Sequence, residues 1–92
     1  VVTLAGNLDT DAWTKLHGFS PLTGSLNPAL QAKRQPFPEL HYLGLQDANL
    51  PPEIFEPIAK ARNRASVILV NNADHACCWA QVWRDALRRL PE

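Results

Sequence analysis

The stretch that decides the expected fold is Ser66-Val67-Ile68-Leu69-Val70-Asn71-Asn72-Ala73-Asp74-His75. Its first five residues form a largely β-branched, apolar run, which is typical of a strand covered on both faces. The next four residues are polar or small and favour a turn. We therefore expect a buried strand over 66–71 that ends in this turn and places His75 just beyond its carboxyl end.

The rest of the chain alternates between strand and helix patterns. Apolar and β-branched runs predict further strands at 1–6 and 39–45. Apolar residues at helical spacing predict helices at 11–17, 53–63 and 75–90. Strands that alternate with helices imply the α/β class, with three parallel strands joined by right-handed crossovers.

Glycines and prolines interrupt the segment 7–37 too often for a long helix or strand. Only one turn of helix is expected there, near Pro28. Irregular segments of this length inside a compact domain are usually functional. We expect residues 1–92 to form the C-terminal portion of a single domain, in which 7–37 is a cap-like or lid-like excursion.

Composition excludes several classes of protein. Hydrophobic residues make up 46% of the chain, too many for a disordered tail. Nine basic residues balance nine acidic ones, whereas a nucleic-acid-binding domain normally carries a basic face. No apolar run approaches the roughly 20 residues that span a bilayer. We therefore expect neither a nucleic-acid partner nor a membrane span.

Two further features concern the origin of the chain. It contains no methionine and opens on an apolar run at Val1, so we expect a piece of a longer polypeptide that starts within a strand. Cys77 and Cys78 are neighbours, and neighbouring cysteines rarely pair with each other. Two reduced thiols suit a cytoplasmic protein, which is the expected location.

Polar residues follow each expected strand. Asn7 and Asp9 follow the first, Asp47 the second and His75 the third. The carboxyl ends of parallel strands share one edge of the sheet, where ligands bind in open α/β folds. We expect Asp47 and His75 to hydrogen-bond there. The carboxylate would fix the imidazole tautomer and leave Nε2 to take a proton from a nucleophile.

Two segments carry a family resemblance. Residues 42–52, YLGLQDANLPP, combine an apolar strand, a G-x-x-D motif and a turn, and residues 70–75, VNNADH, precede an aromatic helix. They resemble the acid and histidine segments of the α/β-hydrolase superfamily, in which the serine lies earlier in the chain. The segment 4–28, through LAGNLD, Trp13, His17 and GSLNP, resembles the strand exit and cap of bacterial esterase-like or lipase-like members.

The resemblance implies a serine hydrolase that cleaves a small-molecule ester or related acyl bond without a cofactor. Asp47 would be the acid of its catalytic triad, and His75 the general base. The chain has no G-x-S-x-G serine and no HGGG-type oxyanion loop. We expect both on the missing N-terminal half of the same polypeptide, the partner of this chain, which is expected to be inactive alone. The expected substrate pocket is lined by Asn7, Trp13, Leu16, His17, Phe19 and Leu22.

Several alternatives stay open. Asp9 is a rival for the triad acid, since some family members carry the acid after the preceding strand, but it also suits the N-cap of helix 11–17. Asp74 is expected to cap the last helix. His17 and His41 have no evident partner, and no pair of residues has recognised ligand spacing, so no metal is expected. The parent could also be a non-catalytic binding or structural scaffold, or could use dehalogenase or carbon–carbon hydrolase chemistry.

Overall fold

Three parallel strands form the sheet, in which β2 lies between β1 and β3. The computed structural model describes residues 1–24, 26–30, 37–62 and 64–89. Strands and helices alternate along the chain, so the expected α/β class with three parallel strands is confirmed. The elements are β1 (Val2–Leu4), α1 (Thr10–His17), β2 (Glu39–Gly44), α2 (Pro52–Lys60), β3 (Ala65–Val70) and α3 (Ala80–Arg89).

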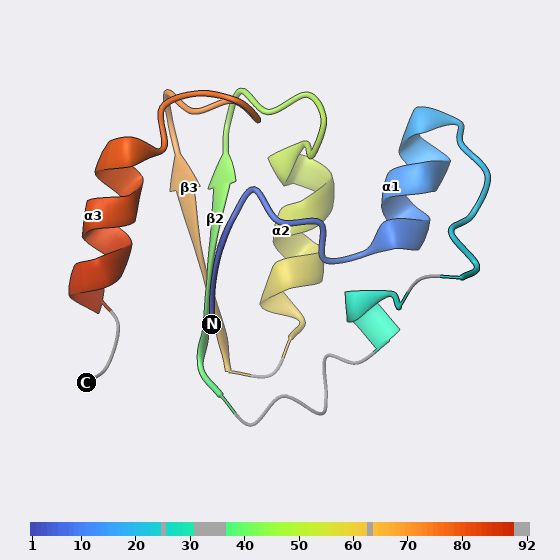
Figure 1. Cartoon of the computed structure of the whole chain (residues 1–92), viewed down its shortest axis with the longest axis horizontal. Helices are drawn as coiled ribbons and strands as arrows, with labels where there is room; N and C mark the ends of the chain where they lie inside the picture. Colours follow the sequence, from blue (N-terminus) through green and yellow to red (C-terminus); the bar gives the residue numbers. More distant parts are fainter. Residues whose placement is uncertain (25, 31–36, 63, 90–92) are drawn as a thin grey trace.

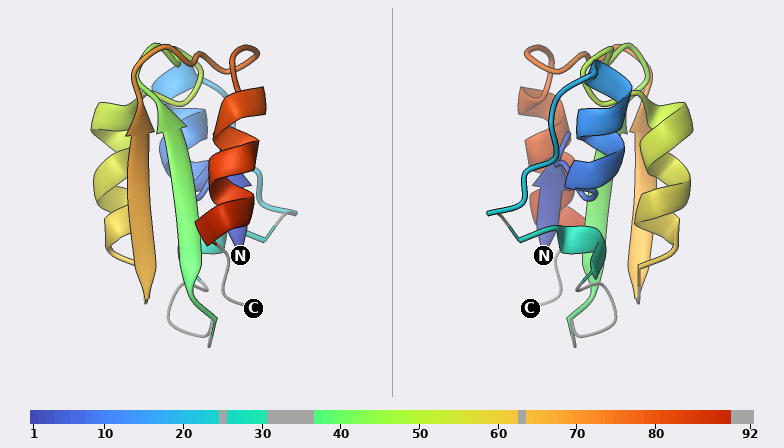
Figure 2. Two further views of the ribbon diagram at one scale, coloured as in Figure 1. Left: turned by 90° about the vertical axis from the view of Figure 1, so that its left-hand side faces the viewer. Right: turned by 90° about the vertical axis from the view of Figure 1, so that its right-hand side faces the viewer.

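Helices α2 and α3 cover opposite faces of the sheet, and α1 lies beyond the side that α2 covers (Figure 1, Figure 2). Successive side chains of a strand point to opposite faces. On β2, Leu43 joins a buried cluster with Phe55 of α2, whereas Tyr42 joins a second cluster with Val82 of α3. Trp79, just before α3, packs against both clusters. Apolar burial on both faces therefore holds β2 in place.

The strand with the clearest apolar run, β3, is an edge strand. Ser66 and Leu69 of β3 are exposed, whereas all six residues of β2 except Leu40 are buried. The apolar run in β3 was the sharper pattern, but strand order decides burial, because only the central strand has neighbours on both sides. Val67 of β3 packs against the cluster on the α2 side, and Ile68 and Val70 pack against the cluster on the α3 side, so the expected covering on both faces is present although no residue of β3 is fully buried.

The start of the expected excursion is ordered around α1. Asp9 is the N-cap of α1, as expected, because its side chain accepts hydrogen bonds from the backbone N–H groups of Asp11 and Ala12. The buried Asn27 donates to the Asp9 carboxylate and accepts from the Thr10 N–H. The expected helical turn is present at 28–30. Ser25 and residues 31–36 of the excursion lie outside the described residues.

Several element boundaries differ from expectation. The first strand ends at Leu4 rather than at 6, because Ala5 adopts a left-handed backbone with a φ of 53° and turns the chain out of the sheet. Helix α2 starts one residue early, at Pro52, where a proline's missing N–H costs little. It ends at Lys60, and position 63 of the expected helix lies outside the described residues.

The last helix begins at Ala80, five residues later than expected. The Asp74 side chain accepts hydrogen bonds from the N–H groups of Ala76 and Cys77, so it caps a turn before the helix and not the helix itself. Cys78 then adopts a left-handed backbone with a φ of 81°, which no α-helix contains. A disulfide joins Cys77 to Cys78, so the expectation of two reduced thiols was wrong. Position 90 of the expected helix lies outside the described residues.

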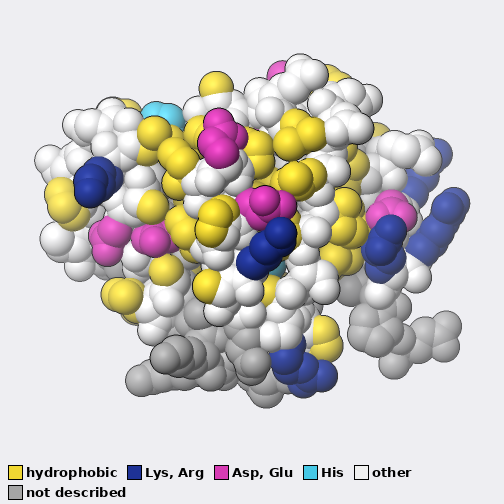
Figure 3. Space-filling view, turned by 180° about the vertical axis from the view of Figure 1, so that it is seen from behind, with side chains coloured by type: hydrophobic (Ala, Val, Ile, Leu, Met, Phe, Trp, Pro, Cys, Tyr) yellow, Lys and Arg dark blue, Asp and Glu magenta, His cyan; other side chains and the backbone are white. Residues whose placement is uncertain are grey.

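The surface is chemically mixed. Acidic, basic and hydrophobic side chains are interspersed on the face seen in Figure 3. Within the described ranges, no helix has both the length and the apolar character needed to cross a bilayer. The location of the protein in the cell stays a prediction.

Candidate active site

The carboxyl ends of β2 and β3 meet at one rim of the sheet. The two strands pair in parallel register up to Gly44 and Val70. Beyond that point the Leu45 N–H donates to the Val70 carbonyl, and the Gln46 N–H donates to the Ala73 carbonyl at 3.1 Å. A Cβ at position 44 would overlap the Ala73 carbonyl oxygen, so only glycine lets the two loops approach this closely. The loops that carry Asp47 and His75 are therefore in direct contact.

Asp47 is held by its own loop. Its carboxylate Oδ1 accepts hydrogen bonds from the N–H groups of Asn49 at 2.9 Å and Leu50 at 2.8 Å. The side chain is 1% exposed. These two bonds occupy one oxygen and fix the plane of the carboxylate, so the second oxygen, Oδ2, is presented in a single direction.

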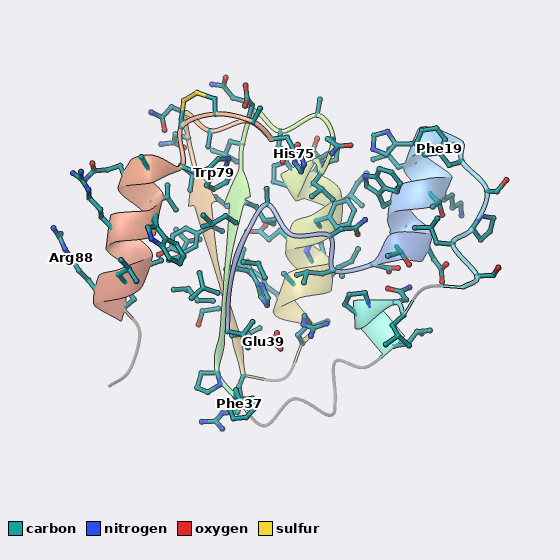
Figure 4. The ribbon with its side chains drawn as sticks, viewed as in Figure 1. Phe19, Phe37, Glu39, His75, Trp79 and Arg88 are labelled. Atoms are coloured by element: carbon teal, nitrogen blue, oxygen red, sulfur yellow. A yellow bond between two sulfur atoms is a disulfide. The ribbon has the colours of Figure 1, made fainter. Side chains whose placement is uncertain are left out.

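His75 is hydrogen-bonded to the second carboxylate oxygen of Asp47. The ring Nδ1 lies 3.0 Å from Oδ2, and the His75 side chain is 45% exposed. Among the described residues, Asp47 is the only hydrogen-bond partner of the ring. An ionised carboxylate only accepts hydrogen bonds, so Nδ1 must donate, and the neutral ring then carries a lone pair on Nε2. Figure 4 places His75 at the rim beyond the strand ends. The expected contact between Asp47 and His75 is therefore present.

Asp9 occupies a different place. Its Oδ1 already accepts hydrogen bonds from the first turn of α1 and from Asn27. The described hydrogen bond from His75 Nδ1 goes to Asp47, not to Asp9. The geometry therefore favours Asp47 as the partner of the imidazole.

Three of the expected pocket residues form one aromatic cluster. The rings of Trp13 and Phe19 are 5.5 Å apart, and that of His17 lies 5.0 Å from Trp13 and 5.9 Å from Phe19. Asn49 ties this cluster to the turn that holds Asp47: its side-chain oxygen accepts from Trp13 Nε1 at 3.3 Å, and its carbonyl accepts from His17 Nε2 at 2.8 Å. His17 thus has a partner, contrary to expectation.

The other three expected pocket residues are not in this cluster. Asn7 accepts a hydrogen bond from the Asp9 N–H and so shapes the turn before α1. Leu16 and Leu22 are 42% and 45% exposed. Whether they contact a substrate stays a prediction.

The chain matches no protein-family model, no curated protein and no solved structure. Its function must therefore be inferred from the chemistry of the residues themselves.

A second polar cluster lies at the amino end of the strands, where Figure 4 shows Glu39 far from His75. The carboxylate of Glu39 accepts from Arg62 Nε at 2.6 Å and from its Nη2 at 3.1 Å, and it lies 2.8 Å from His41 Nε2. His41 Nδ1 in turn lies 2.7 Å from the hydroxyl of Thr3. All but Thr3 are buried, at 9% exposure or less. His41 was expected without a partner, and it has two.

The neighbours of Glu39 favour the ionised form of its carboxyl group. The Arg62 guanidinium holds the pKa of the Glu39 carboxyl below its usual value of 4.5, against burial, which acts to raise it, and the His41 hydrogen bond adds to the lowering. The second guanidinium end, Nη1, donates to the carbonyl of Pro28 at 2.8 Å. The cluster thus joins β1 and β2 to the segment just after α2 and to the turn at 28–30.

One hollow of the described surface lies away from the rim. It measures about 670 Å³ and lies at the amino end of the strands, toward the end of α3. It is lined by Val1, Phe37, Pro38, Glu39, Leu40, Arg64, Ser66, Ile68 and Arg89. Over the part of the chain that the structure describes, no three His, Cys, Asp or Glu side chains converge to hold a metal ion.

Sequence reasoning missed three residues that support the rim. Gly44 permits the close approach of the loops, and the glycine of the G-x-x-D motif was a signal for it. Asn49 links the acid turn to the aromatic cluster, for which the sequence holds no signal. Trp79 Nε1 donates to the Asp74 carbonyl at 2.9 Å and so closes the loop around His75.

Proposed function

We propose that this chain supplies the acid and the histidine of a Ser-His-Asp triad in a serine hydrolase of the α/β-hydrolase type, related to carboxylesterases and lipases. The observation that carries the proposal is the 3.0 Å contact between His75 Nδ1 and Asp47 Oδ2. It joins a buried acid to a half-exposed ring at the carboxyl ends of neighbouring parallel strands.

In this mechanism each group has one task. Asp47 holds the Nδ1–H tautomer of His75, so that Nε2 accepts the proton of a serine hydroxyl as that oxygen attacks the acyl carbon. The carboxylate stabilises the imidazolium that results. Nε2–H then gives the proton to the departing alcohol oxygen, and water repeats the sequence to release the acid.

The nucleophile must come from outside these residues. The printed sequence has no G-x-S-x-G motif, and neither Ser20 nor Ser66 follows a strand and opens a helix, the setting that exposes a nucleophilic serine. We propose that an N-terminal half of the same polypeptide supplies the serine and the oxyanion donors. The aromatic cluster of Trp13, His17 and Phe19, which Asn49 ties to the acid turn, would contact the acyl or alcohol group of a small ester.

The test uses the longer polypeptide that contains this chain, with a short-chain p-nitrophenyl ester as substrate. His75→Gln is expected to lower kcat by about 10⁴-fold or more, and Asp47→Asn by about 10⁴-fold, since the asparagine oxygen keeps the two backbone bonds but cannot hold the imidazolium. Asp9→Asn is the matched control and is expected to keep activity within about threefold.

Three results would contradict the proposal. These are unchanged activity of His75→Gln, a loss in Asp9→Asn as large as that in Asp47→Asn, and ester turnover by the isolated 92-residue chain. An upstream sequence without a serine nucleophile would favour the non-catalytic scaffold, and an aspartate at that position would favour dehalogenase chemistry.

A further inference from the structure

A disulfide lies two residues after His75. Cys77 and Cys78 are bonded to each other in the loop 71–79 that connects β3 to α3, and both residues are exposed. Cys78 also borders a hollow of about 400 Å³ between β3 and α3. A thiol reagent in solution can therefore reach the bond without unfolding the sheet.

The disulfide stands in the backbone that positions His75. The side chain of Asp74, the residue before His75, accepts through Oδ1 from the N–H groups of Ala76 at 2.9 Å and Cys77 at 2.7 Å. Trp79 Nε1 also donates to the Asp74 carbonyl at 2.9 Å and closes the loop. The Cys77–Cys78 disulfide lies within the short segment that these hydrogen bonds hold together.

The backbone conformation of Cys78 is unfavourable for a residue with a side chain. Cys78 has a φ of 81°, in the left-handed region. A side chain with a Cβ is costly there, and such a conformation persists only where the surroundings enforce it. Among the described contacts of the loop, the disulfide to Cys77 is the one that restrains the Cys78 side chain. Without the link, Cys78 is free to return to an ordinary backbone, and the loop between Asp74 and Trp79 changes shape.

The ring of His75 has little else to hold it. It is half-exposed, and within the described residues its one hydrogen bond is the contact to Asp47. Asp47 is fixed by its own turn and does not follow the loop. A change in the 74–79 backbone therefore alters the distance between Nδ1 and Oδ2 directly.

We propose that the Cys77–Cys78 pair is a redox switch for the His75–Asp47 couple, with the disulfide form as the aligned state. A thiolate of a dithiol reductant attacks one sulfur, forms a mixed disulfide and releases the other cysteine as a thiol. The second thiol of the reductant then displaces the first cysteine. The protein gains two electrons and two protons, and the dithiol becomes a cyclic disulfide. The consequence for catalysis rests on the function proposed above.

The test measures the ring tautomer of His75 in the full 92-residue chain by nitrogen–proton correlation NMR, with His75→Gln to assign the signals. In the disulfide form, the neutral ring is expected to be mainly the Nδ1–H tautomer. After reduction with dithiothreitol, the ratio of Nδ1–H to Nε2–H is expected to fall by roughly tenfold, the equivalent of one charge-assisted hydrogen bond. His17, whose Nε2 donates to Asn49, is the internal control and is expected not to change.

The double variant Cys77→Ser, Cys78→Ser is the matched control, and it is expected to show the reduced-state ratio with and without dithiothreitol. An unchanged ratio, while a thiol reagent counts two free cysteines, would overturn the switch and leave the triad proposal intact. Failure of the two cysteines to pair under oxidised glutathione would overturn the switch as well. An Nε2–H tautomer in the disulfide form would overturn the His75–Asp47 couple itself, and with it the proposed function.

Discussion

Replacing Gly44 with alanine tests whether the contact between the two loops positions the rim. The added Cβ would overlap the Ala73 carbonyl oxygen and would lie 2.9 Å from the carbonyl carbon. Both atoms are backbone, so no side chain can rotate away. To restore a normal carbon–carbon contact, the loop between β3 and His75 must move by roughly 1 Å.

The expected loss in the free energy of unfolding has two parts. Forcing one extra carbon into a packed backbone contact destabilises a protein by about 1–3 kcal/mol. The same shift lengthens the bond from the Gln46 N–H to the Ala73 carbonyl, now 3.1 Å, whose loss costs about 1 kcal/mol. We expect Gly44→Ala to lower the free energy of unfolding by about 2–4 kcal/mol. Because His75 follows Ala73 by two residues, the His75–Asp47 hydrogen bond should also be weakened.

Urea unfolding followed by circular dichroism measures the first effect, and the tautomer of His75 measures the second. Gly24→Ala is the matched control, because nothing lies within 4 Å of the position its Cβ would take. Its effect is expected to stay within about 0.5 kcal/mol. If Gly44→Ala unfolds like Gly24→Ala, or if His75 keeps its tautomer in a destabilised chain, the close approach at Gly44 does not position the histidine.

Three further predictions concern buried polar groups. Arg62→Met leaves the Glu39 carboxylate without its main partner and should destabilise the fold by about 3–5 kcal/mol, whereas Lys60→Met, which removes only a surface pair with Glu56, should cost less than about 1 kcal/mol in the same urea experiment. Because Arg62 lowers the pKa of Glu39, the wild type should lose stability as the pH falls below 4.5 towards the folded pKa, and this slope should flatten in Glu39→Gln. Tyr42 is the only tyrosine, and burial together with its hydrogen bond to Asp85 raises its pKa to about 12, so the phenolate absorbance should appear near pH 12 in the folded chain and near 10.0 in urea. A phenolate that titrates at its usual pKa in the folded chain would contradict the burial of this hydroxyl.

The strands could be predicted because their pattern is local. The apolar runs at 39–45 and 66–71 lie within one residue of β2 and β3. Which of them is buried could not be predicted in this way, because it depends on strand order. The start of α3 was missed for another reason: the spacing of apolar residues from Ala76 fits a helix, but the Asp74 cap and the left-handed Cys78 interrupt it first.

The two polar clusters differ in how far the sequence could predict them. The contact between Asp47 and His75 follows from topology, since both residues come just after neighbouring parallel strands. The contact of Glu39 with Arg62 follows from no local pattern, because Arg62 lies after α2 and reaches back across the layer to the beginning of β2. This contact can be recognised only in the packed structure, where the start of β2 lies beside the segment after α2. A carboxylate buried there is costly unless a cation pairs with it.

The two clusters also show which feature distinguishes a reactive histidine from a structural one. Thr3, His41 and Glu39 have the composition of a triad, with a hydroxyl and an acid on either side of an imidazole. Both nitrogens of His41 are hydrogen-bonded and the residue is 1% exposed, so neither nitrogen can accept a proton from an incoming group. His75 has the same kind of acid partner, but within the described residues only one of its nitrogens is hydrogen-bonded, and its side chain is 45% exposed. The pairing of acid and imidazole occurs at both ends of the sheet, and the 45% exposure of the His75 side chain makes that end the candidate for catalysis.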